Sequence, residues 1–188
     1  IDALGWEVAD PMDFDAILER AQKAGANPEI GDPALCQARR VERLVHFTGP
    51  DGVRNELVMG LGQASTAFSS TLMPGGFLTG AMGLGHVVLS SPDRQLAASF
   101  YRNVLGMRLS LELQFSIGPI EIGGVFLHCN PRNHSLALFE MPTKGRIHHV
   151  IIEANDICDV GGARPRAPKP KAPITLTLGH HPEPDGMI

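Results

Sequence analysis

Several features that define whole classes of protein are scarce in this chain of 188 residues. Its three cysteines (Cys36, Cys129 and Cys158) are too few and too scattered for a disulfide scaffold, which fits a reducing cytoplasm. Positive charge is not in excess, because the net charge is −4, so a nucleic-acid partner lacks electrostatic support. No apolar run approaches the roughly 20 residues that a membrane span needs, so no membrane partner is expected.

What the chain does contain is typical of a globular protein built from short strands. Apolar residues make up 43% of the chain and charged residues 19%, which excludes disorder as the dominant state. The 21 glycines and 15 prolines favour many turns over a helical bundle. We therefore expect one domain, or two small ones, with a substantial apolar core.

The apolar pattern predicts a first unit of one strand, one helix and two further strands. The helix is expected to begin at an N-cap, Asp13, and to end at Gly25. A turn at residues 49–52 predicts that the last two strands form a hairpin. The expected strands cover residues 4–9, 41–47 and 54–59.

A second unit repeats this order. Ser91 is the expected N-cap of its helix and Pro92 the expected first residue, and Gly106 ends it. The expected apolar stripe of this helix comprises Leu96, Phe100, Tyr101 and Val104. The expected strands cover 84–90, 107–115, 123–129 and 134–139, and a third unit is expected to contain strands at 146–153 and 174–178 with a brief helix from Ile157 between them.

A unit that recurs about every 60 to 80 residues indicates an internal repeat. Residues 61–82 are rich in Gly, Ser and Thr and lack a clear period, which predicts a linker. We predict an α+β fold of repeated modules, whose curled, mostly antiparallel sheets surround a shared cavity. On such sheets, every second side chain faces the cavity.

Three histidines lie in or beside different predicted strands. His86 and His149 interrupt apolar strands, where burial of an imidazole without a partner is unfavourable, and His134 is expected to open another strand. A core histidine bonded to a backbone carbonyl would explain each of them singly. Together they could converge on a metal ion, because neutral imidazole is a common ligand and two histidines with one carboxylate form the site of non-haem Fe(II) oxygenases. Of His148 and His149, only one can face the cavity, because neighbouring side chains in a strand alternate.

Four segments carry a specific pattern: GLGHVVLSSPD at 83–93, FYRNVLGMRLS at 100–110, FLHCNPRNHSLAL at 126–138 and GRIHHVIIE at 145–153. Weaker matches to the same pattern are GWEVAD at 5–10, FTGPDGVRNEL at 47–57 and ITLTLGHH at 174–181. Together these segments resemble the type I extradiol ring-cleavage dioxygenases of the vicinal oxygen chelate superfamily. The similarity is greatest to enzymes for bicyclic catechols, such as the 2,3-dihydroxybiphenyl 1,2-dioxygenases.

The resemblance implies a fold of βαβββ modules, a site and a cofactor. It implies that His86 and His149 bind the metal, that His134 and His181 are catalytic, and that Val88, Phe126 and Ala137 line the substrate pocket. The implied metal is Fe(II), with Mn(II) as an alternative because the same ligands accept it. The implied domains are the second module of an N-terminal domain (1–60), a linker (61–82) and an incomplete catalytic C-terminal domain (83–188).

The implied function is extradiol cleavage of an aryl-substituted catechol by dioxygen in aromatic hydrocarbon catabolism, as in biphenyl degradation. A catecholic substrate, dioxygen and, at full length, further copies of the chain are the expected partners. Two alternatives stay open: a non-catalytic or degenerate binding module of the same superfamily, and another metal-dependent member such as an isomerase or a glutathione-type transferase.

The chain also departs from the family pattern. The family's third ligand, a glutamate, and its active-site tyrosine have no match here, and both ends are expected to be cuts through a longer protein. Glu153 and Glu183 are candidate substitutes, but spacing favours neither. Asn133 stands where the family has a second histidine beside His134. Prolines are dense over residues 160–186, which suggests a local reading-frame error or a degenerating copy.

Overall fold

The computed structural model describes residues 2–141 and 145–167 of the chain. The first unit contains strands β1 (Leu4–Glu7), β2 (Glu29–Ile30), β3 (Arg43–Thr48) and β4 (Arg54–Met59), with helices α1 (Pro11–Lys23) and α2 (Pro33–Arg39). The second contains β5 (Gly85–Ser90), β6 (Arg108–Ile117), β7 (Ile120–His128) and β8 (Leu136–Phe139), with helix α3 (Arg94–Asn103). Strand β9 (Ile147–Ile152), helix α4 (Ile157–Ala163) and a 3-10 turn (Arg164–Arg166) follow. The predicted strand at 174–178 lies outside the described residues.

Helix α1 begins three residues earlier than its predicted N-cap requires. Asp10, not Asp13, is the N-cap, and its carboxylate accepts a hydrogen bond of 2.7 Å from the backbone N–H of Met12. Pro11 occupies the first turn, where its missing N–H leaves no unmade helical bond. The predicted end is confirmed, because Gly25 follows the helix with a positive φ of 74°.

Helix α3 also begins at a different cap from the predicted Ser91. Asp93 is the N-cap and accepts a hydrogen bond of 2.8 Å from the backbone N–H of Leu96. A carboxylate here also interacts favourably with the helix dipole. The predicted apolar stripe is partly wrong, because Leu96 is 56% exposed, whereas Ala97 and Tyr101 are fully buried.

Strand β2 and helix α2 have no counterpart among the elements expected from the sequence. Strand β2 is two residues long, and its Glu29 and Ile30 pair with His46 and Val45 of β3. Helix α2 has a good N-cap in Asp32, but none of its residues is buried. Without a buried stripe, the apolar period that identifies a helix is missing.

The four strands of each unit follow the same order, and β9 extends the second sheet beside β5. The first has the order β1-β4-β3-β2, and the second has the order β6-β7-β8-β5-β9. In each unit the first strand pairs in parallel with the last, and the other neighbours within the unit are antiparallel. This shared topology confirms the internal repeat and the mostly antiparallel α+β fold of βαβββ-like modules. Over the described residues both sheets are open and do not close on themselves.

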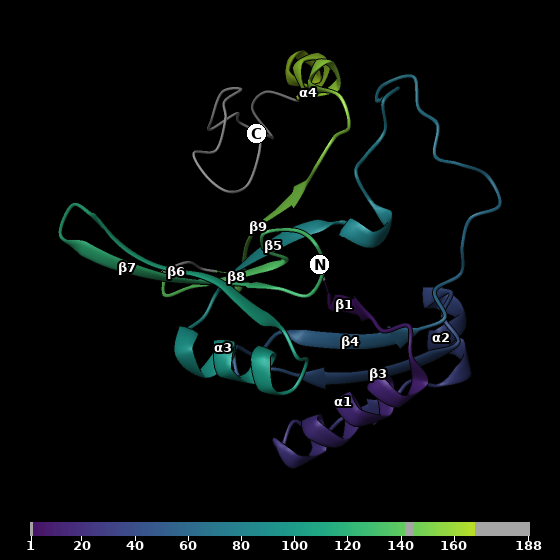
Figure 1. The fold of residues 1–188 in the computed structure, drawn as a ribbon. Coiled ribbons are helices and arrows are strands. Elements are labelled where there is room, and N and C mark those ends of the chain that lie inside the picture. Colours follow the sequence, from purple (N-terminus) through teal and green to yellow (C-terminus); the bar gives the residue numbers. More distant parts are fainter. Residues whose placement is uncertain (1, 142–144, 168–188) are drawn as a thin grey trace.

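The two units share an apolar interior. Trp6, Phe100 and Leu105 each pack against both of the main clusters of buried apolar side chains. Figure 1 shows the cause, because α3 lies beneath the second sheet and beside strands β3 and β4 of the first. A buried hydrogen bond of 2.9 Å, donated by the Tyr101 hydroxyl to the Asp51 carboxylate, joins the same two units.

The segment between β4 and β5 carries no strand and runs along helix α4. Gly75 donates its backbone N–H to the Asp159 carboxylate, and Phe77 forms an isolated bridge with Ala154. A short 3-10 helix, Gly80–Met82, then leads into β5. The segment is therefore held in place by residues more than 70 positions further along the chain.

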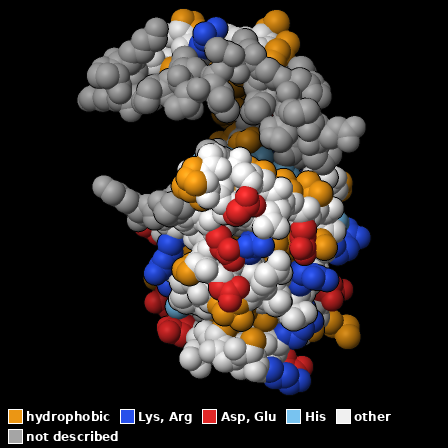
Figure 2. All heavy atoms as spheres, turned by 90° about the vertical axis from the view of Figure 1, so that its left-hand side faces the viewer, with side chains coloured by type: hydrophobic (Ala, Val, Ile, Leu, Met, Phe, Trp, Pro, Cys, Tyr) orange, Lys and Arg blue, Asp and Glu red, His pale blue; other side chains and the backbone are white. Residues whose placement is uncertain are grey.

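The surface carries charges of both signs. Figure 2 shows acidic and basic side chains interspersed over one side of the protein, with separate hydrophobic patches among them. Among the described residues, no helix is both long enough and apolar enough to cross a lipid bilayer.

Candidate active site

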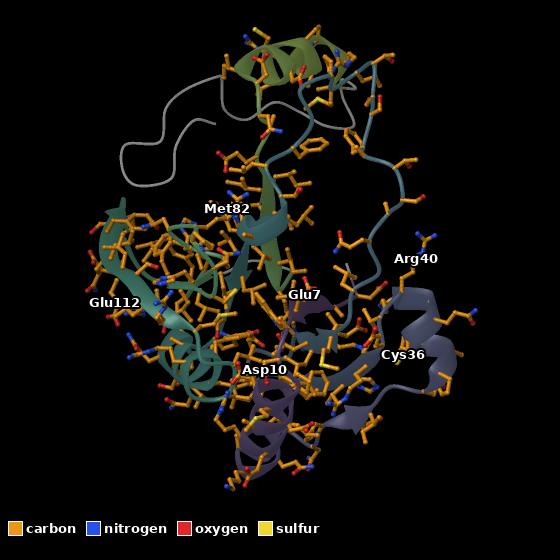
Figure 3. The ribbon with its side chains drawn as sticks, turned by 45° about the vertical axis from the view of Figure 1, so that its right-hand side comes forward. Glu7, Asp10, Cys36, Arg40, Met82 and Glu112 are labelled. Atoms are coloured by element: carbon orange, nitrogen blue, oxygen red, sulfur yellow. The ribbon has the colours of Figure 1, made fainter. Side chains whose placement is uncertain are left out.

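One row of residues across the second sheet contains most of the predicted site. It runs from His149 in β9 through Val88 in β5, Ala137 in β8 and Phe126 in β7 to Leu111 in β6. Residues that pair directly across strands point to the same side of a sheet, so these five side chains share a face. The alternate residues of β5, β7 and β8 pack with α3 in the core, so the row lies on the face opposite that helix. Figure 3 labels Glu112 on the edge strand β6 and Met82 in the short 3-10 helix just before β5.

Three imidazole rings meet beside this row. His86 lies two residues before Val88 in β5 and therefore shares its face. The centroid of the His86 ring lies 5.8 Å from that of His149 and 4.1 Å from that of His134. The Phe126 ring meets the His134 ring edge to face at 4.8 Å. The structure thus brings together the three histidines that the sequence placed on separate segments.

His134 does not open a strand, as predicted, but precedes β8 by two residues. The next residue, Ser135, already bridges two strands, because its N–H donates to Leu127 and its carbonyl accepts from the N–H of Val87. These two bonds fix the backbone beside His134, whose side chain is buried at 2% exposure.

The spacing of His86 and His149 fits two ligands of one metal ion. A metal–nitrogen bond of about 2.1 Å places an imidazole centroid about 3.2 Å from the ion, so two rings can share an ion when their centroids lie within about 6.5 Å. The observed 5.8 Å satisfies this limit, and both side chains lie on the same face. The donor set, two neutral imidazoles, suits Fe(II).

A β-bulge lies in β9 directly beside the candidate ligand His149. Val88 pairs with His149 and Leu89 pairs with Ile147, so His148 is the extra residue. The bulge interrupts the alternation that predicted opposite faces for the two histidines, and their Nδ1 atoms lie 2.7 Å apart. Burial, and then the neighbouring His148, hold the pKa of His149 below its ordinary value. A lowered pKa favours the neutral ring, which is the state that binds a metal ion.

Comparisons with known proteins agree with this geometry. The sequence profile of the Glyoxalase/Bleomycin resistance protein/Dioxygenase superfamily matches residues 83–188. The chain belongs to this superfamily. The resemblance and the fold class predicted from the sequence are thereby confirmed.

Individual relatives within the superfamily are extradiol dioxygenases. The chain is 39% identical over 182 residues to a biphenyl-2,3-diol 1,2-dioxygenase of Paraburkholderia xenovorans (strain LB400), covering 94% of this chain and 60% of the relative. It is 37% identical over 186 residues to an iron-dependent extradiol dioxygenase of Rhodococcus jostii (strain RHA1), with coverages of 94% and 61%. A crystal structure of a catechol 2,3-dioxygenase superposes with a TM-score of 0.86 at 31% identity, covering 99% of this chain and 66% of that one. The chain thus spans less than two thirds of these relatives.

This member of the superfamily supplies two candidate metal ligands in its described part, but not a third. Over residues 2–141 and 145–167, no group of three His, Cys, Asp or Glu side chains is arranged to hold an ion. Glu153, one of the candidate substitutes, forms an ion pair with Arg132 instead. Arg132 also donates to the carbonyls of Met82 and Leu78, so the pair belongs to the packing of the segment before β5. Glu183 and His181 lie outside the described residues.

Two further residues beside the site were not expected from the sequence. Phe139, two residues after Ala137, contacts Phe126 on the same face at 5.5 Å between ring centroids, and strand alternation could have found it. Ser110 is the extra residue of a bulge in β6, between the pairs formed by Leu109 and Leu111. No sequence signal identifies it, because a bulge is a property of two paired strands.

Proposed function

We propose that this chain carries part of the active site of an extradiol dioxygenase that cleaves aryl-substituted catechols such as 2,3-dihydroxybiphenyl. The observation that supports the proposal is the meeting of His86, His134 and His149 on one sheet face, beside a row of apolar side chains. The chain belongs to the matching superfamily, and relatives at 37 to 39% identity are named as enzymes of this type.

In this proposal, His86 and His149 hold the metal ion. Fe(II) is the proposed ion, since one relative is named iron-dependent and imidazole is a common ligand of iron, and Mn(II) is the alternative ion. When bound, the ion supplies the electron-transfer chemistry that couples a catechol to dioxygen. The lowered pKa of His149 favours the neutral ring, and only a neutral imidazole can coordinate the ion.

His134 is the proposed acid and base. Imidazole can accept a proton from a catechol hydroxyl near neutral pH and return it later in the reaction. The burial of His134 between His86 and Phe126 limits exchange of that proton with bulk water. In the overall reaction, the ring bond between one hydroxyl-bearing carbon and its neighbour without a hydroxyl group breaks. One atom of dioxygen becomes the carbonyl oxygen of the product, and the other becomes a carboxylate oxygen.

The apolar row is the proposed wall of the substrate pocket. Val88 and Ala137 are small and buried, and Phe126 and Phe139 present aromatic edges on the same face. Such a wall can hold the second ring of an aryl-substituted catechol and keep competing water out.

Other expectations stay predictions. They are the catalytic role of His181, the division into residues 1–60, 61–82 and 83–188, the homo-oligomer and the cytoplasmic location. The whole activity is proposed for a chain that spans about 60% of the curated relatives that it matches.

A non-catalytic binding module is the second candidate. The absence of a third metal ligand among the residues that the structure describes favours this candidate. A small aromatic compound would then occupy the apolar row without chemical change.

An aerobic assay with 2,3-dihydroxybiphenyl, with and without added ferrous iron, tests the proposal. A yellow ring-fission product that depends on iron and is lost in His86→Ala and His149→Ala supports the dioxygenase. Iron that binds through these histidines without any product contradicts turnover by this chain and favours the binding module. A product that is independent of both histidines would overturn the assignment of the site.

A further inference from the structure

The bulge in β6 places a hydroxyl group beside the turn that carries His134. Leu109 pairs with Leu127 of β7 and Leu111 pairs with Phe126, so Ser110 has no partner in the ladder. Bulges of this kind often redirect a side chain next to a functional site. The Ser110 hydroxyl is hydrogen-bonded to the backbone carbonyl of Asn133, immediately before His134.

The Ser110 hydroxyl uses its only proton in the hydrogen bond to the backbone carbonyl of Asn133. A carbonyl oxygen can only accept, so the Ser110 O–H donates to it. The same oxygen lies 2.6 Å from Nδ1 of His128, which must then donate its own N–H to Ser110. His128 therefore has a structural part here: it holds the orientation of the Ser110 hydroxyl.

The side chain of Asn133 makes the next contact. Its amide oxygen Oδ1 lies 3.1 Å from Nδ1 of His134. An amide oxygen accepts and cannot donate, so Nδ1 of His134 must carry a proton. In a neutral ring the lone pair is then on Nε2, because an imidazole holds one proton on one of its two nitrogens.

We propose that Asn133 is a positioning residue that fixes the tautomer of His134, with its own backbone anchored by Ser110 at the bulge. In this way Asn133 makes Nε2 the nitrogen that can accept a proton. Partners of this type commonly set both the tautomer and the orientation of functional histidines. The inference rests on the proposed function only for the consequence on turnover, since the tautomer itself is a property of the folded chain.

The tautomer can be measured directly in the full-length chain, without metal, from long-range proton–nitrogen correlation spectra of ¹⁵N-labelled histidines. His134→Gln identifies the signal. We expect a protonated Nδ1 and an unprotonated Nε2 for His134 in the wild type. Asn133→Asp, which keeps an acceptor oxygen, should retain that tautomer, and Asn133→Ala should give a mixture of both. Asn103→Ala, the same substitution at an exposed site at the end of α3, should change nothing.

A wild-type ring protonated at Nε2 would overturn the proposal, and so would an unchanged single tautomer in Asn133→Ala. If Asn133→Ala does not fold, the wild type and Asn133→Asp decide the question by the same criterion. With ferrous iron and 2,3-dihydroxybiphenyl, Asn133→Ala should lower kcat about 10- to 100-fold, with KM little changed. Asn133→Asp should keep most of the wild-type kcat. A wild type with the expected tautomer but no ring cleavage would remove the proposed function and leave the positioning role intact.

Discussion

The two sheets share one topology but use the face opposite their long helix differently. In the first sheet a row across four strands carries Gly5, Glu56, His46 and Glu29. In the second, the corresponding face carries the apolar row and the three histidines. The repeat therefore fixes the scaffold, and the side chains on one face decide whether a unit can bind a ligand.

The first sheet neutralises the charge that it places on this face. Glu56 is buried and accepts hydrogen bonds from Arg39 of α2 and from Arg54. These two arginines hold the pKa of Glu56 below its ordinary value. Figure 3 labels Cys36 within α2 and Arg40 directly after it, beside the first sheet. A carboxylate with two cationic partners is satisfied and is therefore a poor candidate for chemistry.

The largest effect should follow from removal of the proposed acid and base in the second sheet. His134→Ala should lower turnover about 10²- to 10⁴-fold, the range for loss of a general acid or base, while iron stays bound. His46→Ala, in the polar row of the first sheet, should leave turnover unchanged. Steady-state rates of ring cleavage check both variants, and normal turnover in His134→Ala would refute the role of this residue.

A smaller effect, on metal affinity, should separate the ligands from the other histidines. His86→Ala or His149→Ala should weaken ferrous-ion binding more than about 100-fold, beyond the range for residues that only support a ligand. Titration of the metal-free protein measures this, with His46→Ala as the matched control. Equal iron binding in all three variants would contradict the site.

The contact between the two units can be tested through stability. Tyr101→Phe removes a donor from the buried Asp51 carboxylate and should destabilise the fold by about 1 to 3 kcal/mol. Burial already raises the pKa of Asp51, so its ionised form is disfavoured in the folded state and its contribution to stability falls as pH rises above about 3.8. Loss of the Tyr101 hydroxyl makes the ionised carboxylate of Asp51 still less favourable in the folded state. Urea unfolding should therefore show a larger loss near neutral pH than near pH 3, and an equal loss at both would contradict the argument.

The smallest effect should come from the ion pairs of the first sheet. Glu56→Gln should cost about 1 kcal/mol, because both arginine partners are partly exposed and screened by solvent. A lowered pKa means that the stabilisation is present above the ordinary value of 4.5 and is lost as pH falls through the lower folded value. The difference in unfolding free energy between wild type and Glu56→Gln should thus shrink in acid. A constant difference down to the lowest pH would show that the charge is not the cause.

Local sequence signals predicted most of the strands and the repeat, but they failed at helix starts and at short elements. Asp10 and Asp93 were missed because each helix start offers more than one capping residue beside a proline, Asp10 and Asp13 in one case and Ser91 and Asp93 in the other. Helix α2 was missed because no part of it is buried. The structure brings His86 and His149 close together, as the hypothesis of a shared metal ion requires, and their role as ligands stays a prediction. The contacts of His134 with Asn133 and Phe126 were not predictable from the sequence.

The sequence by itself determined which residue types lie at every second position of each strand, and hence an apolar face interrupted by histidines. Only the tertiary structure decided on which side of the sheet each of these residues lies. Simple alternation places Leu109 and Leu111 on one side of β6, but the bulge at Ser110 puts them on opposite sides and moves Leu111 into the row of the site. Alternation is a property of one strand, whereas a bulge depends on how two strands distant in the sequence pair with each other.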